Sequence, residues 1–333
     1  MQCSSIPRTT RTRGVSTMRR LAKISLTAAA AVLATVPWAS AQQQGGTLTV
    51  AHPAALPTSD PHFIQGQTNS SIFPHVYEML VTVGEDMGPA LQLAESYELA
   101  DDGVTYTFTL REGVPFHNGD IMTSADVLAS WQRYKEMSPG GKALAPVAEM
   151  SAPDDLTFVV RLDEPNPLFL ASIISPTYPI AIIPEEETGK GRGEIEPIGT
   201  GPYVFTEIVA DDRIVLDRFE DYALNEDAPE GFDGYTGRKT PYLDRIVYQI
   251  IPEANSRASA LEAGAADFTT LIPVTTLRRL VDSGDFQDVT FRQFAKALFP
   301  MNTQNGPTTD VKVRQAIQAA ANMEEIMTIA WEG

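Results

Sequence analysis

The chain has 333 residues, 43% of them hydrophobic, and its 43 acidic residues against 25 basic ones give a formal net charge of −18. This length and composition allow a sizeable core, with about two domains as the first expectation. The acidic excess argues against binding to nucleic acid or to anionic membrane surfaces.

The first 41 residues have the layout of a secretory signal peptide. Three basic residues, at positions 19, 20 and 23, precede an apolar run that ends at Val36, and the small-residue site Ala39-Ser40-Ala41 follows. The apolar run is too short to span a membrane. We therefore expect cleavage between Ala41 and Gln42, export to the periplasm, and Met18 as the true start, which makes residues 1–17 a misassigned extension. An organelle transit peptide is the weaker alternative.

The charge and cysteine content change at that predicted cut. Residues 1–41 hold six basic and no acidic residues, so the remainder has 19 Lys and Arg against 43 Asp and Glu. Cys3, the only cysteine, lies upstream of the cut. The mature chain is therefore expected to have no disulfide, no cysteine nucleophile, no cysteine metal site and no lipid anchor at its start.

Alternating and helical patterns predict the elements of the first half. A capping box of Thr123 and Asp126 starts one helix, whose buried stripe includes Trp131. A hairpin turns at Asp101-Asp102-Gly103. In chain order, the expected elements are a strand at 46–51, a helix over 70–81 in spite of Pro74, strands at 96–99 and 104–110, a helix from 123 to 134, a strand at 156–162 and a short helix from 165 to 174.

The second half centres on a predicted βαβ unit. The nearly continuous apolar run 246–251 favours a strand buried on both faces, a helix follows Pro252 and ends at Gly264, and 267–271 is the next strand. Its crossover should be right-handed, and ligands bind beyond the carboxyl ends of such strands, here 252–255 and 272–273. The other expected elements are strands at 204–209, 214–219 and 289–294 and a loop over 220–240. Two further helices are expected, one at 274–283 that ends at Gly284 and one that is capped by Asp310 and runs through Ala321.

Catalytic and metal-binding patterns are missing from the sequence. The four histidines, His52, His62, His75 and His117, have no short ligand spacing, and local hydrogen bonding in a turn explains His117 better. No G-x-S-x-G or S-x-x-K set is present, and Gly199-Thr200-Gly201 is too short for a phosphate loop. We expect no catalytic residue, no metal, no cofactor and no enzyme activity.

Four motifs, in order, resemble one known family. They are Phe116-His117-Asn118-Gly119-Asp120 with the following Thr123 to Val127; Gly199 to Tyr203; Tyr242 to Asp267; and Asn302 with Asp310 to Ile317. Together they resemble the dipeptide-, oligopeptide- and nickel-binding proteins of ABC importers, the family-5 extracellular solute-binding proteins. The resemblance covers nearly all of the mature chain.

The resemblance implies an α/β, two-lobed periplasmic-binding-protein type II-like fold. Residues 42–70 and 191–272 would form lobe 1, with an extra subdomain at 71–190. Residues 273–333 would begin lobe 2, which we expect to be incomplete because family members continue beyond this point; the chain is interpreted as C-terminally truncated. The acidic residue that pairs with a peptide's amino group in the family would lie in the missing region.

Six residues on loops facing the implied cleft are predicted to contact ligand. Amides and hydroxyls offer donors and acceptors to a peptide-like backbone, and one phenyl ring offers an apolar wall. Ordinary loop capping explains each of them equally well. The six are Phe63, Thr68, Asn69, Thr200, Asn302 and Gln304.

The sequence thus predicts a periplasmic, monomeric solute-binding component of an ABC importer. It would capture a peptide-like or small polar solute and deliver it to a permease in the inner membrane. A nickel-chelate or opine-type solute is an alternative within this class. An exported α/β hydrolase is the alternative from another class, although no nucleophile supports it.

Overall fold

The computed structural model describes residues 44–63, 67–228, 231, 233–289 and 299–331. The predicted signal segment and its cleavage site at Ala41 and Gln42 lie outside these residues. Among the residues described, no helix is both long and apolar enough to cross a bilayer.

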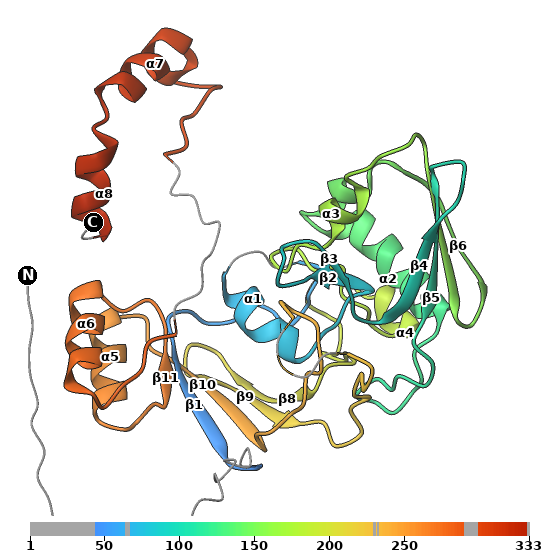
Figure 1. The fold of residues 1–333 in the computed structure, drawn as a ribbon, viewed down its shortest axis with the longest axis horizontal. Coiled ribbons are helices and arrows are strands. Elements are labelled where there is room, and N and C mark those ends of the chain that lie inside the picture. The colour runs from blue at the N-terminus through green and yellow to red at the C-terminus, as the bar shows by residue number, and fades with distance from the viewer. Residues whose placement is uncertain (1–43, 64–66, 229–230, 232, 290–298, 332–333) are drawn as a thin grey trace, which may run out of the picture. The chain divides into compact units, whose positions relative to one another are not determined.

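A five-stranded mixed sheet contains the predicted βαβ unit (Figure 1). Strand β1 pairs in parallel with a neighbour on each side, and the two outer strands beyond β10 are antiparallel. The predicted strand–helix–strand order is correct, but β1 lies between the two strands of the unit. In spatial order the strands are β11 (Phe268–Thr269), β1 (Thr47–His52), β10 (Arg245–Ile250), β9 (Arg213–Arg218) and β8 (Tyr203–Val209).

The two faces of this sheet are covered unequally. On one face Val50, Ile246 and Tyr248 are buried in a cluster with α1 (Gln67–Ile72) and η1 (Phe73–His75). On the other face α5 (Ala254–Glu262) packs against β1 and β11. The prediction that 246–251 is buried on both faces is wrong, because the alternate residues Val247 and Gln249 are only half-buried.

The helix predicted over 70–81 is also wrong in its extent. Proline lacks an N–H and its ring clashes with the preceding turn. The α-helix accordingly ends at Ile72, Pro74 lies in the short 3₁₀ segment η1, and the chain continues into strand β2 (Val81–Val83). Strand β2 pairs with β3 (Pro89–Leu91) in a separate two-stranded sheet.

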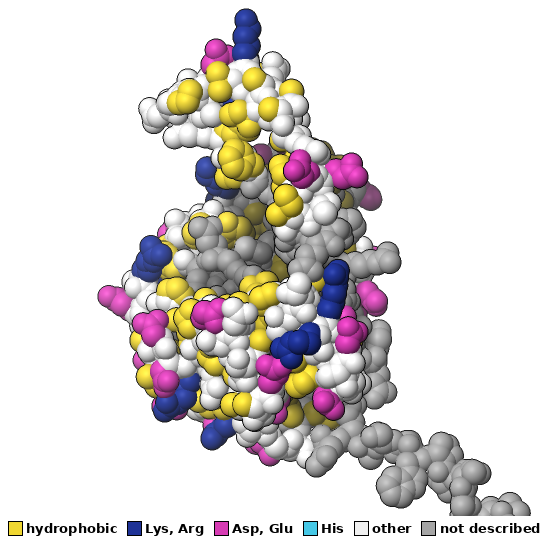
Figure 2. All heavy atoms as spheres, turned by 90° about the vertical axis from the view of Figure 1, so that its left-hand side faces the viewer, with side chains coloured by type: hydrophobic (Ala, Val, Ile, Leu, Met, Phe, Trp, Pro, Cys, Tyr) yellow, Lys and Arg dark blue, Asp and Glu magenta, His cyan; other side chains and the backbone are white. Residues whose placement is uncertain are grey.

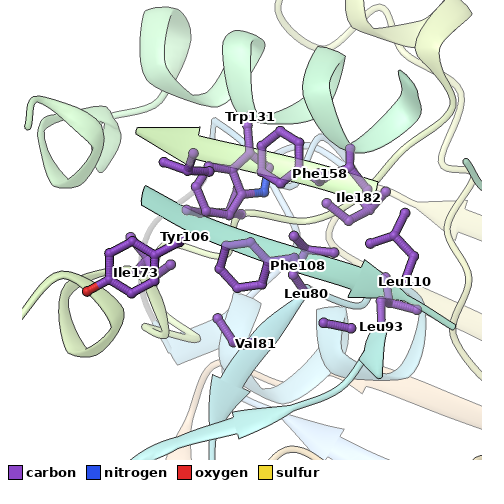
Figure 3. Close-up of a cluster of buried hydrophobic side chains, with 14 of the residues drawn as sticks. Leu80, Val81, Leu93, Tyr106, Phe108, Leu110, Trp131, Phe158, Ile173 and Ile182 are labelled. Atoms are coloured by element: carbon purple, nitrogen blue, oxygen red, sulfur yellow. The ribbon is translucent and has the colours of Figure 1, made fainter. Parts of the chain in front are cut away.

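A second core lies between a four-stranded antiparallel sheet and α2 (Ser124–Met137) (Figure 3). Trp131 points from α2 towards Phe108 and Phe158 on the strands, with ring centroids 6.3 and 5.1 Å away. The predicted capping box is confirmed, since the Thr123 N–H donates to Asp126 Oδ2 at 2.8 Å. The sheet order is β4 (Ala94–Leu99), β5 (Thr105–Leu110), β7 (Thr157–Leu162) and β6 (Val147–Asp154).

Short segments complete this part of the chain. They are η2 (Gly141–Leu144), α3 (Phe169–Ile173) and α4 (Glu185–Thr188). The described residues of 220–240 contain no helix or named strand, as expected.

Helix α6 (Val274–Ser283) agrees with its prediction to the residue, and Gly284 ends it with φ +83°. Arg279 pairs with Glu262 of α5 at 2.5 Å, so α6 is linked to the βαβ unit (Figure 1). The lobe boundary at 273 remains a prediction.

The last helices leave apolar side chains at the surface. Asp310 caps α7 (Val311–Ala320) by accepting from the Lys312 N–H at 2.8 Å, as predicted. The preceding η3 (Pro307–Thr309) and the following α8 (Met323–Trp331) were not predicted. Figure 2 shows hydrophobic side chains on the surface of this region, consistent with the exposure of Val311, Met323 and Ile326. The strand expected at 289–294 lies outside the described residues except for Val289.

Candidate functional site

The carboxyl ends of β1, β10 and β11 lie side by side, because all three strands are parallel. Ligands of open α/β sheets bind beyond such ends. One buried side chain, Arg257 of α5, fixes the two loops that leave β10 and β11. Its guanidinium donates to the carbonyls of Ile251 and Pro252 at 2.9 and 2.8 Å, and to those of Thr270 and Leu271 at 3.2 and 2.6 Å.

The Leu271 backbone has a positive φ of +54°, unusual for a branched residue. Hydrogen bonding of its carbonyl by Arg257 stabilises this conformation at the start of the loop predicted to face ligand. Arg257 is only 2% exposed, so the contact is part of the structural frame.

The loop that leaves β1 is held by a buried ion pair. Arg133 of α2 donates to Asp60 through two bonds, Nη1–Oδ1 at 2.9 Å and Nη2–Oδ2 at 2.7 Å. The His62 and Gly193 N–H groups also donate to Asp60, at 3.1 and 3.3 Å. Burial alone would raise the pKa of Asp60, but the hydrogen bonds and charge of Arg133, together with these amides, lower it below its ordinary value.

His62 belongs to the same network. Its Nδ1 accepts from Arg133 Nη1 at 3.0 Å, and its Nε2 donates to the Ala181 carbonyl at 2.9 Å. Acceptance at Nδ1 requires the neutral ring, with its proton on Nε2. The pKa of His62 is lowered to about 4, mainly by burial and also by the charge of Arg133, while the Ala181 hydrogen bond and the charge of Asp60 oppose this shift.

Phe63, the predicted apolar wall, follows directly and is half-buried. The Cζ atoms of Arg133 and Arg192 lie 5.4 and 4.8 Å from its ring centroid. These distances are those of cation–π contacts. Phe63 is therefore flanked by two guanidinium groups as well as placed on a candidate ligand loop.

Thr68 and Asn69 lie in the first turn of α1, within the backbone that the structure describes. The following Ser71 ties this helix to the sheet: His52 Nε2 lies 3.2 Å from Ser71 Oγ, and the Tyr248 hydroxyl donates to the Ser71 carbonyl at 3.1 Å. Thr68 and Asn69 are thereby placed on the same helix that closes one face of β1 and β10.

Thr200 is fully buried, and its hydroxyl donates to Glu78 Oε2 at 3.1 Å. The other Glu78 oxygen accepts from the Tyr222 hydroxyl and from Lys239 Nζ, each at 3.0 Å. This satisfied buried carboxylate holds three distant segments together. The contacts support a positioning role for Thr200 rather than direct contact with a solute.

Two of the motifs noted in the sequence contact each other through His117. Its N–H donates to the Gly199 carbonyl at 2.9 Å, its Nδ1 accepts from the Gly199 N–H at 3.2 Å, and its Nε2 donates to the Gly201 carbonyl at 2.9 Å. The expected hydrogen bonding at His117 is thus present, but its partners are more than eighty residues away rather than in its own turn. Gly199 is required because a Cβ there would lie 2.1 Å from the Val76 carbonyl oxygen.

Asn302 and Gln304 form a local turn: the Asn302 side-chain oxygen accepts from the Gln304 and Asn305 N–H groups at 2.8 and 3.0 Å. They are exposed, and they follow the undescribed residues 290–298. Within the described ranges no contact brings them to Phe63 or Thr200. The observed hydrogen bonds of Asn302 agree with loop capping, which was the alternative to ligand contact.

Within the same ranges, no group of three or more His, Asp or Glu side chains lies close enough to hold a metal ion. Sequence reasoning missed the buried charges Asp60, Glu78, Arg133 and Arg257 and the stacked Arg192. No signal in the helix pattern pointed to Arg133, which lies outside the predicted buried stripe. A buried arginine requires a partner.

Comparison with known proteins shows which family the chain matches. The profile of the bacterial extracellular solute-binding proteins, family 5 (middle part), matches residues 88–333. The glutathione-binding protein GsiB of Pectobacterium atrosepticum is 27% identical over 324 residues, covering 96% of this chain and 59% of the relative.

Solved structures of binding proteins are also similar to this chain. The oligopeptide-binding protein AppA of Bacillus subtilis, in complex with a nonapeptide, superposes with a TM-score of 0.71 at 26% identity, covering 86% of this chain and 56% of AppA. The binding protein AgaA of A. tumefaciens R10, in complex with agropinic acid, gives a TM-score of 0.60 at 27% identity, covering 71% and 46%. The chain thus spans about half the length of the proteins it matches.

Proposed function

Because the chain belongs to the bacterial extracellular solute-binding proteins of family 5, we propose that it acts as the solute-binding component of an ABC importer. It captures a peptide-like or small polar solute and delivers it to a permease in the inner membrane. The observation that carries this proposal is the family match over residues 88–333, together with the fixed loops at the carboxyl ends of β1, β10 and β11.

The buried charged side chains at this edge of the sheet suit a protein that binds its solute without changing it. Asp60 and Arg133 are paired with each other, and Arg257 donates to backbone carbonyls, so these side chains hold loops in place. Solute would be enclosed by hinge closure, which differential contacts with the closed state stabilise. The relatives named above are binding proteins, which is consistent with a protein that is not an enzyme.

Phe63 has the strongest support among the six proposed ligand residues, since its half-buried ring lies in the loop after β1. Thr68 and Asn69 remain proposed contacts from the neighbouring helix α1. Asn302 and Gln304 remain proposed contacts from the other side of a cleft. Thr200 belongs to the proposal as a residue that positions the Gly199–Gly201 turn.

The solute class is supported by the named relatives. Glutathione is a tripeptide derivative and the AppA ligand is a nonapeptide, both of which favour peptide-like solutes. Agropinic acid, bound by AgaA, supports the opine-type alternative. The nickel-chelate alternative would require a chelate that brings its own ligands, because the described residues form no metal-binding group.

We further propose that the protein is exported by its signal peptide, matures at Gln42 and works as a periplasmic monomer. Amino-terminal sequencing of exported protein tests the cleavage site. A start other than Gln42, or retention of Arg19 and Arg20, contradicts it.

Equilibrium dialysis against a mixture of short peptides, glutathione and opines, followed by mass spectrometry, tests the function. We expect one solute class to be retained with its mass unchanged. Cleavage products that depend on the protein would favour the hydrolase alternative. Retention of no solute would contradict the proposal.

A further inference from the structure

Arg192 is held on the ring of Phe63 while its charge stays in solvent. The Arg192 Cζ lies 4.8 Å from the Phe63 ring centroid, closer than Arg133 at 5.4 Å. The two arginines differ in burial and in ion pairing. Arg133 is 3% exposed and paired with Asp60, whereas Arg192 is exposed.

Arg192 has no carboxylate or hydrogen-bond partner among the described residues, although acidic side chains lie nearby in sequence. Glu187 is paired with Lys190 at 2.6 Å. Glu194 accepts from the Gly191 N–H at 3.1 Å. In a chain with a net charge of −18, a guanidinium that stacks on an aromatic ring and leaves its N–H groups unused needs an explanation.

The backbone next to Arg192 is fixed by the same carboxylate that fixes the loop after β1. Gly193 N–H donates to Asp60 Oδ2, and Asp60 also accepts from the His62 N–H next to Phe63. The ring and the guanidinium are therefore carried by two loops with one common anchor. Their relative position is set before any solute arrives, which lowers the ordering cost of binding.

We propose that Arg192 binds a carboxylate group of the solute at this edge of the site. The solutes that the protein binds would then carry a negative charge at one end. The inference rests on the proposed function, since it names a contact within the same site. A guanidinium stacked on a ring keeps its in-plane N–H edges free for a two-point bond to carboxylate. A lysine ammonium could supply the positive charge but not the two parallel N–H donors of a guanidinium.

Two matched libraries of two- to five-residue peptides test this contact, one with free carboxyl termini and one with carboxyl-terminal amides. They are offered by equilibrium dialysis to the unchanged chain, to Arg192→Gln, to Arg192→Lys and to the control Arg161→Gln. Arg161 is also an exposed arginine, but it pairs with Glu149 on another sheet. Thermal unfolding of each variant confirms that it is folded.

We expect the unchanged chain and Arg161→Gln to bind the free acids about tenfold more tightly than the amides, which corresponds to one charged contact. Arg192→Gln should abolish this preference by weakening the acids alone, and Arg192→Lys should restore only part of it. Phe63→Leu, which removes the support of the guanidinium, should reduce the preference in the same direction.

Equal binding of acids and amides by the unchanged chain, or a preference that survives Arg192→Gln, overturns the inference and leaves the proposed function standing. If neither library, nor glutathione, nor an opine is retained by the unchanged chain, the proposed function fails, and the inference fails with it.

Discussion

Arg133 and Asp60 form a two-point ion pair, with N–O distances of 2.9 and 2.7 Å, in which neither side chain is more than 1% exposed. The pair joins α2 to the loop after β1. A buried carboxylate that loses its partner is strongly destabilising because its charge cannot be resolvated. The ion pair therefore controls both stability and the shape of the candidate site.

Arg133→Gln should lower the free energy of unfolding by about 3–5 kcal/mol, measured by urea denaturation. Arg161→Gln is the control, because Arg161 and its partner Glu149 are at least half exposed, and such pairs contribute less than about 1 kcal/mol. Equal losses in the two variants would show that the Asp60 pair is not uniquely important.

Gly199→Ala tests the close approach between the two motifs joined by His117. The new Cβ would lie 2.1 Å from the Val76 carbonyl oxygen, so the backbone must move, at a cost of about 1–3 kcal/mol. Gly189→Ala is the matched control, since no atom lies within 4 Å of its Cβ position and its φ is −78°. That variant should stay within about 0.5 kcal/mol of the unchanged chain. A tolerated Gly199→Ala would show that the turn relaxes freely.

The pH dependence of stability should report on His62. Its folded pKa of about 4 lies below the unfolded value of about 6.5, so the folded state binds fewer protons between these two values. The stability contributed by neutral His62 is thus fully present above pH 6.5 and is lost as the pH falls towards 4, with a slope of at most about 1.4 kcal/mol per pH unit.

His62→Gln isolates this contribution. The groups facing His62 are Arg133, which stays charged, Tyr134, whose ring contacts it edge-on, and Asp60, whose pKa is lowered and so titrates at lower pH. Urea denaturation at several values between pH 7 and 4.5 should give a shallower slope for the variant than for the unchanged chain. Identical slopes would mean that His62 does not titrate in this range.

Trp131→Ala should destabilise the chain by about 3–5 kcal/mol, because Trp131 is 1% exposed and packs on Phe108 and Phe158 (Figure 3). Leu168→Ala is a control from the same part of the chain, since Leu168 is 71% exposed and should change stability by no more than about 0.5 kcal/mol. A loss below about 1 kcal/mol for Trp131→Ala would contradict the packing.

The sequence was sufficient to predict helix starts and ends that depend on neighbouring residues. The Thr123–Asp126 capping box, the Gly284 helix end and the Asp310 cap depend on neighbouring residues, and all three are present as predicted. Pro74 was also a local signal, but its effect was underestimated, so the helix predicted over 70–81 was too long.

Long-range determinants were not predictable in the same way. The placement of β1 between β10 and β11 depends on a strand almost two hundred residues upstream. The bonds of His117 to Gly199 and Gly201, and the partners of Asp60 and Glu78, join segments whose separation carries no periodic signal. The predicted contacts at Thr68, Asn69, Asn302 and Gln304 remain predictions, because they depend on a solute and on how a cleft closes.

The most direct test of solute binding is the dependence of thermal unfolding on solute concentration, with the solute recovered from the dialysis experiment. Binding to the folded state stabilises by RT ln(1 + [L]/Kd), about 2.7 kcal/mol at a hundredfold excess over Kd. We predict an unfolding temperature that rises with the logarithm of concentration, with the solute recovered intact. An unfolding temperature that stays constant up to millimolar solute would contradict the assignment as a solute-binding protein.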